Sequence, residues 1–278
     1  MRRINLRKKK RLELKNINLK SKKLLFLFIA ILLICLIMYC FFINNFFIKR
    51  NFEKEYLTIS NANQNIPFKI NKIILFSSAT ANTNAVNQSV LGVDISQYCD
   101  IGIYITNSTS NDILIDSLYI DNIKISTPEL GTPCLYKKKI NDLGKCSFSE
   151  DSIIQDNFYF NIINSEQKIN YDNYEIYNNS STPISLGFYN KNVKTNFLMD
   201  NSEIKYDGTL LKSAMVSQTG LNCNVSFTIN IIANNGGHYI SNINFDIPLE
   251  SEEESIYNTG YVTKEFDNSQ TCNFFKIN

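Results

Sequence analysis

The sequence predicts an all-β protein whose main domain, residues 66–278, is an antiparallel β-sandwich. Apolar side chains recur at every second position in several short segments, as they do in strands with one buried face. Clusters of Asn, Asp, Ser and Gly separate these segments, and no segment after residue 48 shows the 3.6-residue apolar stripe of an amphipathic helix. Strands that follow one another without intervening helices favour a sandwich or a barrel over a parallel α/β sheet.

The alternating segments give the expected strands. In chain order these are 68–76, 101–106, 113–125, 153–163, 184–189, 210–216, 223–233, 239–249 and 273–277, with a polar loop over 77–89. Gly236-Gly237 between two of them indicates a hairpin turn. We interpret residues 66–278 as a single sandwich, similar at the level of fold to immunoglobulin-like or jelly-roll-like domains. Two smaller sandwiches that part near residues 200–208 are the alternative. Such a fold does not by itself define a function.

The N-terminal region predicts a membrane anchor over residues 24–48. Leu24 to Ile43 are twenty residues without a charge, Pro, Gly or amide, and a helix of about 20 residues spans the ~30 Å hydrocarbon core of a bilayer. Residues 1–23 hold eleven Lys or Arg against one acid, Glu13, a net +10. The positive-inside rule then places the N-terminus in the cytoplasm.

The predicted topology is therefore a cytoplasmic basic tail (1–23), a signal anchor in the lipid bilayer (24–48), a stalk (49–65) and an extracytoplasmic domain (66–278). This is a single-pass protein of the cell membrane. A cleaved signal peptide is the alternative, but its apolar region is only about 7–15 residues and ends in a small-x-small site.

The charge of the outer region excludes several classes of partner. Residues 51–278 hold fifteen Lys, no Arg and twenty-five Asp or Glu, a net −10. Nucleic-acid binding needs clustered cations that neutralise phosphates, so we expect no nucleic-acid partner. Clamps for phosphate or carboxylate favour the planar guanidinium of Arg, which this region lacks.

No catalytic, cofactor-binding or metal site is predicted. The chain has one histidine, His238, which we interpret as a turn or strand residue because a single His cannot build a multi-His zinc site. Ser-x-x-Lys occurs at Ser165/Lys168 and Ser202/Lys205, but neither copy precedes a clear helix, as the Ser–Lys enzymes require. The four carboxylates of residues 250–254 lack the spacing of a calcium loop and indicate a solvated turn.

Five cysteines follow the anchor: Cys99, Cys134, Cys146, Cys223 and Cys272. None forms Cys-x-x-Cys, which argues against zinc ribbons and thioredoxin-like chemistry. Cys134 and Cys146 enclose the segment LYKKKINDLGK, whose Asn-Asp-Leu-Gly indicates a turn, and we predict that they form a disulfide. The alternative is that all five are small, reduced core residues.

The expected function follows from the anchor, the strands and the missing catalytic set. We expect a non-enzymatic cell-envelope protein that binds a protein or cell-wall partner or serves as a structural part of a surface assembly. The alternative is a membrane-anchored hydrolase with an atypical Cys- or Ser-based site.

Overall fold

A computed structural model describes residues 66–107, 113–164, 173–178, 183–247, 255–266 and 273–277. The chain divides into two compact units, Met1–Asn61 and Ala62–Asn278, and every described residue belongs to the second. The predicted tail, anchor and stalk in residues 1–65 lie outside the described residues. Among those described, no helix is long and apolar enough to cross a membrane.

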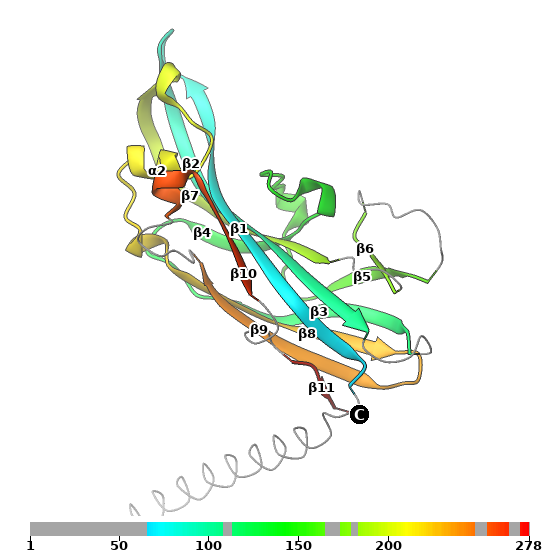
Figure 1. Ribbon diagram of the computed structural model, residues 1–278. Helices are drawn as coiled ribbons and strands as arrows, with labels where there is room; N and C mark the ends of the chain where they lie inside the picture. The colour runs from blue at the N-terminus through cyan, green and yellow to red at the C-terminus, as the bar shows by residue number, and fades with distance from the viewer. Residues whose placement is uncertain are drawn as a thin grey trace, which may run out of the picture. The chain divides into compact units, whose positions relative to one another are not determined.

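The described chain is mostly β and is built on two sheets, with few helices, which confirms the coarse fold prediction (Figure 1). Sheet A has the strand order β10-β1-β2-β7-β4, and every neighbouring pair in it is antiparallel. Its strands are β1 (Phe68–Ala85), β2 (Val90–Asn107), β4 (Thr132–Lys137), β7 (Ile184–Asp200) and β10 (Tyr261–Phe266).

Sheet B has the strand order β11-β9-β8-β3-β5-β6. Its strands are β3 (Ile115–Ile125), β5 (Phe158–Ile163), β6 (Glu175–Tyr177), β8 (Cys223–Ala233), β9 (His238–Ile247) and β11 (Phe275–Lys276). β6 pairs parallel to β5, which departs from the predicted antiparallel pattern. In the sequence, residues 164–174 separate β5 from β6, which is far more than the two residues of a tight hairpin.

Strands from both halves of the chain share each sheet. β10 follows residues 200–208 and pairs with β1, while β8 also follows them and pairs with β3. The main core lies between the sheets and is formed by the alternate apolar residues of both, such as Ile101, Leu186, Leu118 and Ile229, each fully buried. The period-two pattern of the sequence produces this core because successive strand side chains point to opposite faces.

A second core forms where sheet A extends beyond sheet B. β1, β2 and β7 have 18, 18 and 17 residues, and their distal halves are covered by short helices. These are α2 (Thr209–Ser213), η5 (Thr219–Leu221) and α3 (Ile256–Thr259), while η4 (Asn201–Glu203) directly follows β7 and has no buried residue. Leu210, Leu211 and Ile256 pack there against Val93 and Ile95 of β2. Figure 1 shows α2 against the ends of the long strands.

Two bulges in β7 mark the passage from the sandwich to this second core. The register against β2 shifts between Val93 and Ile95 and again between Ile95 and Gln97. Asn192 and Asn196 of β7 take left-handed φ values of 59° and 53° at these shifts. Such bulges bend a strand and increase its local twist.

Several segments differ from the sequence prediction, including β4, β6 and the first half of β2, which were not expected as strands. The expected loop 77–89 is mostly strand: β1 continues to Ala85 because its Ser, Thr and Asn residues pair with β2. The expected strand 210–216 is instead α2 and the following turn, since the consecutive Leu210 and Leu211 are both buried, which one strand face cannot achieve. β10 has an irregular apolar pattern, and the sequence analysis missed it.

Candidate functional site

The face of sheet A that points away from sheet B carries a buried polar site. In β2, Cys99 and Ile101 point into the main core, so Tyr98 and Asp100 point to the other face. Tyr98 is nevertheless 6% exposed and Asp100 only 2%. A covering loop, residues 138–149, shields them; it leads from β4 past the short helix η2 (Ile140–Asp142). A second short helix, η3 (Glu150–Ser152), follows it.

Gly187 lets side chains of β4 reach β2 across β7. Tyr136, Gly187 and Asp100 form one row across the three strands. A Cβ atom at Gly187 would lie 2.1 Å from Cζ of Tyr136, so the tyrosine ring occupies the space that any side chain there would need. The fully buried Tyr136 therefore lies flat over β7 and extends toward Asp100.

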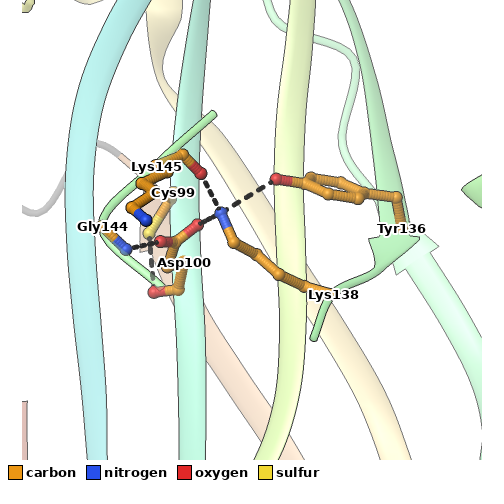
Figure 2. Close-up of polar contacts among 6 residues, drawn as sticks. All are labelled: Cys99, Asp100, Tyr136, Lys138, Gly144 and Lys145. Atoms are coloured by element: carbon orange, nitrogen blue, oxygen red, sulfur yellow. Dashed lines mark hydrogen bonds and ion pairs between the residues drawn. The ribbon is translucent and has the colours of Figure 1, made fainter. Parts of the chain in front are cut away.

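Lys138 and Asp100 form an ion pair at the centre of the site (Figure 2). Their side chains are 0% and 2% exposed. The Lys138 ammonium also donates to the carbonyl of Lys145 at 2.6 Å and to Oη of Tyr136 at 3.4 Å. It lies 5.5 Å from the ring centre of Tyr98, which provides a further, cation–π attraction.

The covering loop completes the site with backbone groups and one ring. The amide N–H of Gly144 donates to Oδ2 of Asp100 at 2.5 Å. Phe148 stacks on Tyr189 with ring centres 4.0 Å apart and an interplanar angle of 3°, and meets Tyr136 edge-on at 5.4 Å. The loop thus excludes water from the Lys138–Asp100 pair.

Burial dominates the electrostatics of this site. Desolvation raises the pKa of Asp100, although the nearby Lys138 charge and the Gly144 N–H act in the opposite direction. Burial likewise raises the pKa of Tyr98 to about 12 and raises the pKa of Tyr136, so both phenols stay protonated at neutral pH. Burial thus penalises the charge of Asp100, and the contacts with Lys138 and Gly144 offset part of this penalty.

The described cysteines are all free thiols. Cys134 lies in β4 and Cys146 in the covering loop, and both are free thiols. The predicted disulfide between them stays a prediction. Burial raises the pKa of Cys99 to about 12 and of Cys134 to about 11, and it also raises the pKa values of Cys146 and Cys223. Protonated thiols are weak nucleophiles. Cys272 lies outside the described residues.

Of the two Ser–Lys motifs, Ser202/Lys205 lies among the described residues. The exposed Ser202 hydroxyl donates to the Asp200 carboxylate at 2.6 Å, and this carboxylate caps η4 by accepting from the Ser202 backbone N–H. Ser165/Lys168 and the acidic residues 250–254 lie outside the described residues. Among the residues that are described, no group of three or more His, Cys, Asp and Glu side chains could hold a metal ion.

A second polar region covers the outward face of sheet B. His238 opens β9, as predicted, and its Nε2 lies 3.0 Å from Oδ1 of Asn230. Asn230 in turn donates from Nδ2 to Asp121 at 2.9 Å, so a hydrogen-bonded row crosses β9, β8 and β3. Beside this row Tyr119 of β3 stacks on Tyr159 of β5, with ring centres 4.7 Å apart.

Further amides extend this polar face of sheet B along β8 and β9. Asn224 donates to Asn244 at 2.7 Å and to Asp246 at 2.8 Å, while Thr228 donates to Asn242 at 3.0 Å. These bonds fix the side chains relative to one another, so ordered amide and carboxylate groups follow β8 and β9, and the aromatic pair lies next to Asn230.

Comparison with protein-family models, with curated protein sequences and with solved structures found no match. The functional argument therefore rests on the two sites themselves. Sequence reasoning missed both of them. Asp100, within the apolar run Tyr98–Tyr104, was the one available signal for its buried pair with Lys138, since a carboxylate inside a buried strand needs a partner.

Proposed function

We propose that this chain is a non-enzymatic, membrane-anchored protein whose extracytoplasmic sandwich, of the immunoglobulin-like or jelly-roll-like kind, binds a neutral polysaccharide of the cell envelope. Residues 24–48 hold it in the membrane with the N-terminus in the cytoplasm. The observation that carries the binding proposal is the polar face of sheet B. Its Tyr119–Tyr159 pair lies beside a row of amides and carboxylates whose positions are fixed by hydrogen bonds.

The chemistry of this face fits sugars better than charged polymers. A sugar ring offers a CH surface that packs on an aromatic ring and hydroxyl groups that exchange hydrogen bonds with amides and carboxylates. Tyr159 is 58% exposed, so one side of its ring is open to a ligand. The net −10 of residues 51–278 and their lack of Arg disfavour anionic polymers.

Mutation of Tyr159 tests this proposal. We expect the full-length protein to be retarded in native gels that contain a soluble neutral polysaccharide, and to sediment with purified cell walls. Tyr159→Ala should abolish both effects. Tyr206→Ala is the matched control, because Tyr206 is also 58% exposed but lies between η4 and α2, away from sheet B.

If Tyr159→Ala is retarded in the gels and sediments with cell walls as the wild type does, the polar face of sheet B is not the binding site. The anchor is tested separately by mass spectrometry of the mature chain from the membrane fraction. A mature N-terminus after residue 40 would show that residues 24–48 are cleaved and not retained.

A further inference from the structure

The Lys138–Asp100 pair differs in kind from the other ion pairs of the described chain. Lys72–Glu265 has side chains 37% and 54% exposed, and Lys191–Glu150 has side chains 44% and 71% exposed. Lys138 and Asp100 are closed off from water by the covering loop and by tyrosine rings. An amine and a carboxyl group therefore meet in a dry site, where water competes least with reaction between them.

We propose that Lys138 and Asp100 become joined by an amide bond between Nζ and Cγ. This intramolecular cross-link would connect β2 to the residue that follows β4. It is independent of the polysaccharide binding proposed above, since the pair lies on sheet A and the polar face lies on sheet B.

The reaction is a condensation that needs no oxidant and no cofactor. A proton passes from the Lys138 ammonium to the Asp100 carboxylate, which gives a neutral amine and a neutral carboxylic acid, so that no net charge is left on either side chain in this buried site. The Nζ lone pair then attacks Cγ and forms the C–N bond. The C–Oδ1 bond breaks, and Oδ1 leaves as water with its own proton and one proton from Nζ.

The surrounding groups are placed to assist these steps. The Gly144 N–H, 2.5 Å from Oδ2, can stabilise the negative charge that develops on this oxygen when the amine attacks. The Lys145 carbonyl accepts from Nζ at 2.6 Å and so holds the amine toward Cγ. Oη of Tyr136, 3.4 Å from Nζ, can accept one proton while it releases another, and so relay the amine proton to the leaving oxygen.

Peptide mapping of the purified full-length chain tests the proposal. A protease that cleaves after lysine should cut after Lys137 and Lys139 but not after Lys138. Tandem mass spectrometry should then find a branched peptide that contains both Asp100 and Lys138. Its mass should be lower than the sum of the two linear peptides by the mass of one water molecule.

Two controls make the result decisive. Lys191 and Glu150 are in direct contact but exposed, so cleavage after Lys191 should be normal in the same digest. In Lys138→Arg, which keeps the positive charge, the branched peptide should be absent. If the wild-type digest instead yields separate linear peptides for Asp100 and Lys138 at full mass, or a branch at another residue pair, the proposal is wrong. The wild-type result decides this even if the variant fails to fold.

Discussion

The contact between Gly187 and Tyr136 predicts that Gly187→Ala destabilises the domain. The new Cβ would lie 2.1 Å from Cζ and 2.2 Å from Cε1 of Tyr136. The ring cannot swing away easily, because Phe148 meets it edge-on and Lys138 lies against its hydroxyl. The substitution therefore overpacks a buried site, and either β4 or the covering loop must move.

The expected magnitude follows from two opposing effects. Overpacking a buried site costs about 1–3 kcal/mol of unfolding free energy. Replacing Gly by Ala restricts the unfolded chain and returns about 0.4–1 kcal/mol. The net loss is about 1–2 kcal/mol, which in a domain of this size lowers the thermal midpoint by about 2–8 °C. Thermal unfolding followed by circular dichroism measures this shift.

Gly102→Ala is the matched control, because Gly102 lies in the adjacent β2 strand and its nearest atoms would be 3.8 and 3.9 Å from the new Cβ. We expect its midpoint to equal or slightly exceed that of the wild type. Adding Gly187→Ala to a Tyr136→Ala background should cost less than Gly187→Ala alone, since the obstructing ring is gone. Equal midpoints for Gly187→Ala and Gly102→Ala would refute this account of the Tyr136 position.

Three further predictions concern the buried pair and the thiols. Lys138→Met should lower the unfolding free energy by about 3–5 kcal/mol, because it leaves a buried carboxylate without its partner. Lys191→Met, at the exposed pair, should leave the urea midpoint unchanged. Urea titration of the two variants checks both expectations. In Lys138→Met, the contribution of Asp100 to stability should be fully present below the ordinary carboxyl pKa of 3.8 and should be lost as pH rises, because burial raises the pKa of Asp100 in the folded state and the unfolded chain releases this proton more readily. A pH series of urea midpoints for the variant and the wild type measures this effect. A difference between the two that shrinks toward neutral pH would contradict it. Under reducing conditions, exposed Cys146 should react with iodoacetamide well before buried Cys99, whose pKa burial raises to about 12; mass spectrometry over time gives the order.

The sequence predicted those strands whose apolar residues alternate most regularly. β8 was expected at 223–233 and lies at Cys223–Ala233, because its odd-numbered residues face the core without interruption. The turn at Gly236 was also predictable, since that residue takes a φ of 81°, which favours glycine. The second half of β7 was missed because its residues NKNVKTNFLMD look like a loop. Its pairing with β2 depends on tertiary contacts that a local pattern does not contain.

The candidate sites were less predictable than the strands, for a related reason. Lys138 lies in a run of three lysines, a pattern typical of a solvated surface. Its burial depends on Asp100, 38 residues earlier, and on Tyr136, whose ring occupies the space that Gly187 leaves over β7. The polar face of sheet B also depends on strand order, since it brings Asn230 of β8 between His238 and Asp121. No local pattern encodes such neighbours.

The bulges of β7 show how a chain poor in glycine and rich in asparagine can still turn its backbone. The chain has ten Gly in 278 residues, and three of the four described non-glycine residues with positive φ are Asn: Asn122, Asn192 and Asn196. At the two β7 bulges, side chains of β2 accept the exposed backbone N–H groups, Ser96 at 3.0 Å and Asp94 at 2.8 Å. Asn tolerates this conformation better than other residues with a Cβ. The asparagines of this chain thus supply the backbone conformation that the two bulges need, and a β-branched residue at either bulge position would be strained.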